Sequence, residues 1–466
     1  MSETITTKVL IIGGGMGGYV CAIRLGQLGV EHTLVEADKL GGTCLIRGCI
    51  PSKAMIHAAA KYETVAKAAD GGTLGITASA PKLDLAQTVA WKDGIVAKLN
   101  GGVGGLLKRA KTRVLNGWAT FTDAKTCTVK TADGEVTVQA ETVLLATGSL
   151  PVELPFMKFG GRVISSTEAL SLPALPKKLV VVGAGYIGLE LGIAYRKLGA
   201  EVTVVEAMDR ILPLYDKPLT DPVRKWLEKH GVALHLGAKA KGLNDKGDAL
   251  VVEGADGKEF SLPADNVLVT VGRKPLTEGW GLEAMGVEMD GRFVKVDEQC
   301  RTNMAGVFAV GDLVGEPMLA HKSAAQGEMV AEIIAGKKRR FDPVTIAAVC
   351  FTEPEIISAG LGPAEVEGRD DVIQAMFPLQ AIGRALAIEA GDDGGFVRVI
   401  ARKDDHRILG IQAVGQHVAE LSNEFATAME MGAVLEDIAG VIHVHPTLGE
   451  AFHEAALRAL GLAIHI

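Results

Sequence analysis

The alternation of apolar and polar residues places a glycine-rich loop directly after the first apolar run of the chain. Residues 8–12 predict a buried strand, residues 13–18 form the loop, and the residues that follow repeat apolar side chains with the period of a helix. A second predicted strand, residues 32–35, ends at Glu36. Strand, glycine loop, helix and terminal acid together indicate a dinucleotide-binding unit, for which the glycines alone would be weak evidence.

The glycines and the acid of this unit have separate predicted roles. Gly13 would make the tight turn, and Gly15 would let the backbone approach a pyrophosphate. Gly18 would allow the helix to pack closely against the strand, and Glu36 would hold ribose hydroxyls.

The same pattern recurs further along the chain, with an offset of 170 for both the first glycines (183 − 13) and the terminal acids (206 − 36). The loop glycines of the second unit are Gly183, Gly185 and Gly188. Because one nucleotide rarely needs two sites on one chain, the repeat indicates two different nucleotides. A flavin and a nicotinamide nucleotide are the natural pair, since a dithiol can reduce a flavin and nicotinamide can accept the electrons as hydride.

Glu206 favours NAD over NADP. A carboxylate at this position bonds the free ribose hydroxyls and would repel a 2′-phosphate, for which an NADP site would use arginine. Arg210 lies four residues further on, and we interpret it as a surface or helix-end charge.

The segments between and after the two units alternate in character. We expect a helical stretch from about residue 54 to 111, a strand-rich region over residues 118–139 and a linker marked by Pro151 and Pro155. Three further buried strands end in small or polar residues whose backbone or side chains could contact a cofactor. These residues are Thr147 and Gly148, Gly272 and Arg273, and Gly311 and Asp312.

The chain changes character from about residue 345. Strand candidates at residues 372–377, 395–400 and 408–414 alternate with helical runs, and no phosphate-binding loop follows. This part therefore predicts an interface domain.

Composition and charge exclude several classes of protein. The 466 residues predict about three domains, and 48 basic against 56 acidic residues argue against nucleic acid as a partner. The basic cluster at residues 337–340 is interpreted as a solvated helix end. The N-terminus carries no basic region ahead of a long apolar run, so we expect a soluble, unexported, cytoplasmic protein.

Two of the six cysteines, Cys44 and Cys49, lie close together in a glycine-flanked segment. We expect a loop to join their sulfurs. Cys49 precedes Pro51 and a run of helix formers, so it would sit at a helix N-terminus, where a thiolate is favoured. Buried unlinked cysteines are the alternative, but the pair is better interpreted as redox chemistry.

One cluster of the C-terminal domain has catalytic character. His445 precedes Pro446, and Glu450 lies five residues further on, where it could orient the imidazole of a general base. For His443 we prefer a histidine hydrogen-bonded inside a turn. Two nearby histidines also raise a metal site, but no third clustered ligand supports one, so we predict no metal.

The two nucleotide loops, the Gly-Cys-Ile-Pro-Ser-Lys segment and the His-x-His-Pro-Thr-Leu-Gly-Glu segment resemble the flavoprotein disulfide reductase family, and within it the branch that oxidises dihydrolipoamide. The resemblance covers essentially the whole chain. It implies an α/β fold with two Rossmann-like domains, for FAD and NAD, and an α+β C-terminal dimerisation domain. The implied boundaries are residues 1–150 for the FAD domain with its disulfide, 151–274 for the NAD domain, 275–344 for a central domain that completes the FAD site, and 345–466 for the interface.

The same resemblance implies roles for single residues. Cys44 would exchange with the substrate, and Cys49 would form the thiolate that faces the flavin. His445 of the partner subunit would act as base, with Glu450 as its orienting acid. Three further implied roles are the pairing of Lys53 with Glu190 near the flavin, the covering of the nicotinamide face by Tyr186, and a bond from Asp312 to the ribityl chain.

Two positions depart from the family pattern. Arg47 puts a charge beside the redox pair, and Met16 stands where proline is common. The implied activity is oxidation of dihydrolipoamide by NAD in a homodimer, with the lipoyl group carried by an acyltransferase or carrier protein of a 2-oxo acid dehydrogenase or glycine cleavage complex. The rivals are an NADPH-dependent glutathione or other disulfide reductase, which Glu206 disfavours, mercuric or thioredoxin reductases, which would need a further cysteine pair near the C-terminus, and a docking subunit without turnover.

Overall fold

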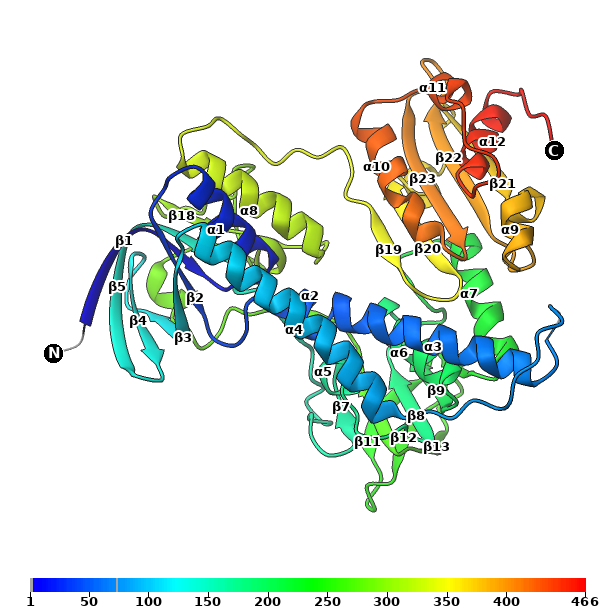
Figure 1. The fold of residues 1–466 in the computed structure, drawn as a ribbon, viewed down its shortest axis with the longest axis horizontal. Helices are drawn as coiled ribbons and strands as arrows, with labels where there is room; N and C mark the ends of the chain where they lie inside the picture. The colour runs from blue at the N-terminus through cyan, green and yellow to red at the C-terminus, as the bar shows by residue number, and fades with distance from the viewer. Residues whose placement is uncertain (1–2, 73) are drawn as a thin grey trace.

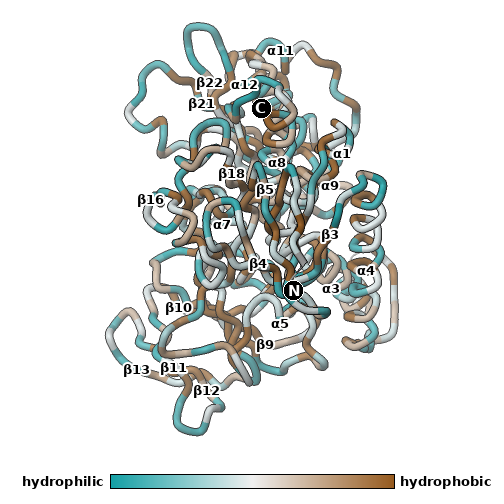
Figure 2. The backbone as a smooth tube through the Cα atoms, turned by 90° about the vertical axis from the view of Figure 1, so that its left-hand side faces the viewer, coloured by the Kyte–Doolittle hydropathy of each residue, from teal (hydrophilic) through white to brown (hydrophobic). Residues whose placement is uncertain are grey.

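The computed structural model describes residues 3–72 and 74–466 and contains three sheets of five or six strands. Two of them hold the predicted nucleotide units, and the third lies in the C-terminal part (Figure 1). Apolar stretches of the backbone concentrate in the strands at the centre of the molecule, and polar stretches in the peripheral loops (Figure 2). None of the described helices combines the length and the apolar character that crossing a bilayer demands.

The first sheet has the order β1-β2-β3-β4-β5-β18, with β1 also paired to β5. Its strands are β1 (Glu3–Ile12), β2 (His32–Glu36), β3 (Arg113–Phe121), β4 (Thr126–Thr131), β5 (Gly134–Leu145) and β18 (Val307–Ala309). Strand β1 is parallel to both neighbours, and Ile12 pairs with Val35 on one side and with Leu145 on the other. This register brings the ends of three strands to one edge, directly before the first glycine loop.

The helices of this part differ in one respect from the sequence prediction. They are α1 (Met16–Gln27), α2 (Gly42–Arg47), α3 (Cys49–Ala69), α4 (Leu85–Arg109), α8 (Ala320–Ile334) and the 3-10 turn η2 (Gly311–Val314). The helical stretch expected over residues 54–111 is confirmed in α3 and α4, but residues 70–72 and 74–84 between them are not helical. Glycines at 71 and 72 and a proline at 81 fall in that interval and explain the break.

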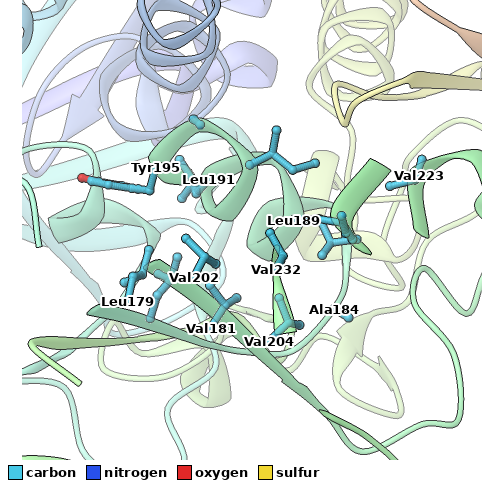
Figure 3. Close-up of a cluster of buried hydrophobic side chains, with 14 of the residues drawn as sticks. Leu179, Val181, Ala184, Leu189, Leu191, Tyr195, Val202, Val204, Val223 and Val232 are labelled. Carbon is cyan, nitrogen blue, oxygen red and sulfur yellow. The ribbon is translucent and has the colours of Figure 1, made fainter. Parts of the chain in front are cut away.

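The second sheet is parallel, with the order β10-β9-β8-β14-β7. Its strands are β7 (Val163–Ile164), β8 (Lys178–Val182), β9 (Glu201–Glu206), β10 (Ala233–Leu236) and β14 (Asn266–Val269), and its helices are α5 (Ser166–Ala169), α6 (Tyr186–Lys197) and α7 (Lys217–Lys229). A three-stranded sheet, β11 (Lys239–Leu243), β12 (Ala249–Glu253) and β13 (Glu259–Pro263), lies beside it. Aliphatic side chains of β8 and β9 pack against α6 around the buried Tyr195 (Figure 3).

The two nucleotide units are joined by paired chain segments. Strands β6 (Ser149–Pro151) and β15 (Arg273–Pro275) form an antiparallel ribbon, so the expected linker at Pro151 is partly a strand. After the ribbon come η1 (Leu282–Met285), β16 (Met289–Asp290) and β17 (Phe293–Val294). The chain then returns to the first sheet, where β18 pairs parallel with β5.

The C-terminal sheet is antiparallel, with the order β19-β20-β23-β22-β21, and the three strands predicted here are confirmed. Its strands are β19 (Ala348–Cys350), β20 (Glu355–Gly360), β21 (Val372–Pro378), β22 (Phe396–Arg402) and β23 (Ile408–Gly415). Its helices are α9 (Gly383–Ala387), α10 (Ser422–Glu430), α11 (Leu435–Gly440) and α12 (Glu450–Ala459), with 3-10 turns η3 (Pro363–Val366), η4 (Leu379–Ala381) and η5 (Val418–Leu421).

Candidate active site

A cavity of about 400 Å³ opens at the carboxyl ends of β1, β2 and β5. Ligands of open α/β sheets bind at such an edge. Many of the residues predicted to bind cofactor or to react line it, namely Gly13, Gly15, Glu36, Cys44, Cys49, Lys53, Thr147, Gly148, Tyr186, Glu190, Arg273, Gly311 and Asp312. Thirteen of the residues predicted from the sequence therefore lie around one cavity, although they come from separate segments of the chain.

The first glycine loop has the geometry of a phosphate cradle. Gly13 has a φ of +101°, and a Cβ there would lie 2.3 Å from the carbonyl oxygen of Ala146. A Cβ on Gly18 would lie 1.8 Å from the carbonyl oxygen of Gly13. By contrast, a Cβ on Gly15 would meet only the Cα of Gly42, at 3.8 Å. Two glycines are thus required by the fold, and the third leaves the room that a pyrophosphate needs beside the start of α1.

Glu36 is held in place by the loop next to it. One carboxylate oxygen accepts a hydrogen bond from the Gly14 amide at 2.6 Å, and the other accepts one from the Asp38 amide at 2.8 Å. Burial raises the pKa of Glu36, while the amides of Gly14 and Ala37 and the nearby Arg47 oppose that rise. The carboxylate is therefore fixed at the edge of the cavity, where ribose hydroxyls would bind.

The second loop repeats this construction in detail. Gly183 has a φ of +102°, and a Cβ on Gly188 would lie 2.3 Å from the Gly183 carbonyl oxygen, whereas a Cβ on Gly185 would meet nothing within 4 Å. Glu206 accepts hydrogen bonds from the amides of Ala184 at 2.6 Å and Met208 at 2.8 Å. Gly272, which follows β14, has a φ of +120° and open space around a Cβ. The second unit thus has the same fit for a dinucleotide as the first.

Cys44 and Cys49 form a disulfide, with Cα atoms 4.6 Å apart. The predicted pairing of their sulfurs is confirmed. The segment between them is not a loop, however, because Cys44 lies within α2, a helix of 6 residues, and Gly48 alone separates α2 from α3. Cys49 is the first residue of α3, so the helix dipole favours its thiolate once the bond is reduced. The remaining cysteines are buried, and burial raises the pKa of Cys127, Cys300 and Cys350 to about 12.

Lys53 lies one turn further along α3 and forms an ion pair with Glu190 of α6, with 2.8 Å between Nζ and Oε2. The other oxygen of Glu190 accepts a hydrogen bond from the Phe351 amide at 3.0 Å. The ammonium group also lies 4.3 Å from the centre of the Phe351 ring. Three separate parts of the chain therefore fix this amine at the cavity wall.

A network of hydrogen bonds joins Arg273, Ser149 and Asp312, and the sequence predicted only part of it. Arg273 donates to the hydroxyl of Ser149 at 2.8 Å and to its carbonyl oxygen at 2.7 Å, and Ser149 in turn donates to Asp312. The Gly311 amide donates to buried Gln326 at 2.8 Å. Sequence reasoning missed Ser149 and Gln326, since neither belongs to a motif.

Thr147, Gly148 and Tyr186 also line the cavity. Thr147 donates its hydroxyl to the Leu276 carbonyl at 2.9 Å, and Gly148 has a φ of +74°. Tyr186 is the first residue of α6, so it stands between the second glycine loop and the first cavity.

The histidine cluster contains two differently bonded imidazoles. The Nδ1 atom of His445 lies 2.9 Å from a Glu450 oxygen, and the other oxygen of Glu450 accepts from the Thr447 amide at 2.9 Å. The His445 side chain is 80% exposed, which leaves Nε2 open to a reactant. His443 instead contacts the Val441 carbonyl at 3.1 Å and Glu424 at 3.2 Å, and the Glu424 contact raises its pKa.

His445 and the disulfide lie in different regions of the same chain. His445 lies between α11 and α12, which stand apart from α2 in Figure 1, and it is not among the residues that line the cavity with Cys44 and Cys49. One chain therefore does not bring the base to its own disulfide.

Over residues 3–72 and 74–466, no group of three or more histidine, cysteine or carboxylate side chains is placed to hold a metal ion.

Two family models divide the chain along these lines. Residues 7–327 match the model of pyridine nucleotide-disulphide oxidoreductases, and residues 346–456 match that family's dimerisation domain. The chain belongs to this family. As a family member it is an oxidoreductase with its own dimerisation domain, and the predicted pairing with a second copy agrees with that domain.

Known proteins align with this chain over nearly its whole length. A dihydrolipoyl dehydrogenase from Pseudomonas aeruginosa is 58% identical and covers 100% of both chains. One from Geobacillus stearothermophilus is 45% identical over 99% of this chain and 98% of its own. The crystal structure of LpdA from Mycobacterium tuberculosis matches with a TM-score of 0.88 at 28% identity, over 97% of this chain and 99% of that one. These likenesses confirm the predicted family, fold class and cofactors, FAD and NAD.

Proposed function

We propose that this protein is a dihydrolipoyl dehydrogenase, which oxidises a dihydrolipoyl group to lipoyl and reduces NAD. The observation that carries the proposal is the disulfide at the start of α3, in the wall of the cavity that also contains Glu36, Lys53 and Asp312. The full-length likeness to proteins named for this activity supports it.

The reaction begins with thiol–disulfide exchange. His445 Nε2 of the partner subunit takes a proton from one thiol of the substrate, and the thiolate attacks Sγ of Cys44. The Cys44–Cys49 bond breaks, and Cys49 leaves as a thiolate. The second substrate thiol, once deprotonated, attacks the mixed disulfide, which closes the lipoyl ring and releases Cys44 as a thiol.

Cys49 then hands on the electron pair. When bound, FAD supplies the carrier that takes two electrons from the dithiol side and gives a hydride to NAD. Cys44 and Cys49 lose their proton and electrons and return to the disulfide. The sum is dithiol plus NAD to disulfide, NADH and one proton, so electrons and protons balance.

His445 suits the first step because the nitrogen of a histidine ring is the usual proton acceptor in general base catalysis. Its Nδ1–H donates to Glu450, which fixes the tautomer with Nε2 as the acceptor. Glu450 also stabilises the imidazolium that forms, as the acid of a catalytic triad does. The exposure of His445 and its absence from the lining of the cavity that contains Cys44 and Cys49 support a role in a partner subunit's site.

Each nucleotide site has its residues assigned. Gly13, Gly15, Gly18, Glu36, Lys53, Thr147, Gly148, Gly311 and Asp312 would hold FAD, with Glu190 paired to Lys53 near the flavin. Gly183, Gly185, Tyr186, Gly188, Glu206, Gly272 and Arg273 would hold NAD. The fixed carboxylate of Glu206 would bond the ribose hydroxyls and disfavour NADP. Arg210 donates to the Pro213 carbonyl at 2.6 Å, which supports its interpretation as a local surface residue.

We assign the four segments as predicted. Residues 1–150 and 151–274 would bind FAD and NAD, residues 275–344 would complete the FAD site, and residues 345–466 would form the interface. The return of β18 to the first sheet supports the third assignment. The lipoyl group would arrive on an acyltransferase or carrier protein of a 2-oxo acid dehydrogenase or glycine cleavage complex, in the cytoplasm.

Steady-state rates test the proposal most simply. Dihydrolipoamide with NAD should be turned over far faster than with NADP, and neither glutathione nor its disulfide should be a substrate with either nucleotide. A higher rate of glutathione disulfide reduction with NADPH would favour the rival assignment and overturn this one.

A further inference from the structure

Arg47 connects the redox-active segment to the ribose end of the cavity. It is the last residue of α2, between the two reactive cysteines, and its guanidinium forms an ion pair with Asp38. Asp38 lies two residues after Glu36 and donates its amide to that carboxylate at 2.8 Å. Arg47, Asp38 and Glu36 all line the cavity.

The charges around Arg47 are mostly acidic. Burial raises the pKa of Glu36, and the charge of Arg47 opposes that rise. The pKa of Glu168 is lowered despite burial by hydrogen bonds from Ser165, with a smaller contribution from Arg47. Burial lowers the pKa of Arg273, and Arg47 adds to that effect. The guanidinium thus lies among three carboxylates, Asp38, Glu36 and Glu168, and one further cation, Arg273. Its ion pair with Asp38 connects the end of α2 to the segment that follows β2.

The Arg47–Asp38 ion pair connects the two ends of residues 38–47, and hydrogen bonds hold the middle of this segment, just before α2. The Gly41 amide donates to the Gly14 carbonyl at 2.8 Å, and Asn100 donates to the Leu40 carbonyl at 2.7 Å. Gly42 approaches Gly15 so closely that a Cβ on it would lie 2.6 Å from the Gly15 Cα. The Arg47–Asp38 ion pair adds a contact at the C-terminal end of α2, the helix that contains Cys44.

We propose that Arg47 and Asp38 form an ionic latch over the ribose end of the FAD site, which retains the cofactor and holds α2 against it. The inference rests on the proposed function, because it requires FAD in this cavity. Both residues are positioning residues. Their side chains are 37% and 51% exposed, so the latch is open to solvent and is screened by salt.

The test measures the rate of FAD release from the purified holoenzyme, followed as the rise in free-flavin fluorescence after mild heating. Arg47→Ala and Asp38→Ala should each speed release about two- to fivefold, as expected for an exposed ion pair. The double variant should be no faster than either single variant, because both remove the same contact. Arg47→Lys should keep part of the effect.

Salt and a matched ion pair separate the latch from a general loss of structure. Release from the unmodified protein should speed up as salt is raised, and release from Arg47→Ala should respond much less. Glu253→Gln removes the ion pair of Lys241 and Glu253, which is also exposed and joins β11 and β12 away from the cavity. That variant should release FAD at the unmodified rate.

Two results would overturn the latch. Additive effects of the two alanine variants would show that Arg47 and Asp38 act separately, and an unchanged release rate in Arg47→Ala would show that the pair does not retain the cofactor. Either result would leave the proposed function standing if the enzyme still turned over dihydrolipoamide. Failure of the unmodified protein to hold FAD at all would contradict the proposed function itself.

Discussion

Lys53 and Glu190 lie 137 residues apart and form an ion pair between α3 and α6, in which the carboxylate is buried and the amine is one-third exposed. The pair joins the helix that begins with Cys49 to the helix that follows the second glycine loop. In the proposed function, reduction of the disulfide and the approach of nicotinamide would occur on either side of this contact.

This asymmetry in exposure predicts unequal costs for the two partners. Lys53→Met leaves a buried carboxylate without its cation and should cost about 3 kcal/mol of stability. Glu190→Gln keeps an acceptor for the Phe351 amide and leaves an amine that reaches water, so it should cost about 1 kcal/mol. Thermal midpoints at saturating FAD check both values, and an equal or larger cost for Glu190→Gln would contradict the explanation.

His445→Gln should lower turnover of dihydrolipoamide by about 10²- to 10⁴-fold, because the proton acceptor is lost. Anaerobic reduction of the enzyme by NADH should persist, since that half-reaction does not use the base. His443→Gln is the matched control and should have a much smaller effect, because both ring nitrogens of His443 already have partners within the fold.

Hybrid dimers test whether the base acts across the subunit interface. Each variant alone, Cys44→Ser or His445→Gln, should be nearly inactive. A dimer with one copy of each contains one site with an intact disulfide and an intact partner histidine, and should recover about half of the unmodified activity. Hybrids that stay inactive would place the base within the same chain.

Glu332 predicts a stability contribution that depends on pH. Hydrogen bonds from Arg24 and Lys337, with Arg339 close by, lower the pKa of this buried carboxyl to about 2. Since its folded pKa is depressed, its contribution is present above the ordinary value of about 4.3 and is lost as the pH falls towards about 2.

Glu332→Gln should therefore cost about 2 kcal/mol at neutral pH, and the gap to the unmodified protein should narrow as the pH falls below about 4. Glu328→Gln is the control, because its carboxylate is exposed and lies 3.8 Å from Arg24. Chemical unfolding across this pH range measures both. A gap that stays constant with pH would contradict the assigned pKa.

Motifs made the nucleotide loops predictable, because Gly18 and Gly188 each meet the backbone of the loop's own first glycine, five residues earlier. The close approach of Gly13 to the Ala146 carbonyl depends instead on the pairing of β1 with β5. The pairing of Lys53 with Glu190 came from the family resemblance, since no local pattern joins residues so far apart. The network of Ser149, Arg273 and Asp312 could be predicted only in part, because it depends on how β6 and β15 pair. Nor could the spacing of the two cysteines distinguish a loop from the short helix α2.

The proposed mechanism requires that Cys44 exchanges with the substrate and that Cys49 faces the flavin. Absorbance of the purified, FAD-loaded variants at long wavelength tests it directly. Cys44→Ser should show a thiolate–flavin charge-transfer band without any reductant, because Cys49 is then a free thiolate at the N-terminus of α3. Cys49→Ser should show none, even after anaerobic NADH. A band in Cys49→Ser, or its absence in both Cys44→Ser and the NADH-reduced unmodified protein, would contradict the account.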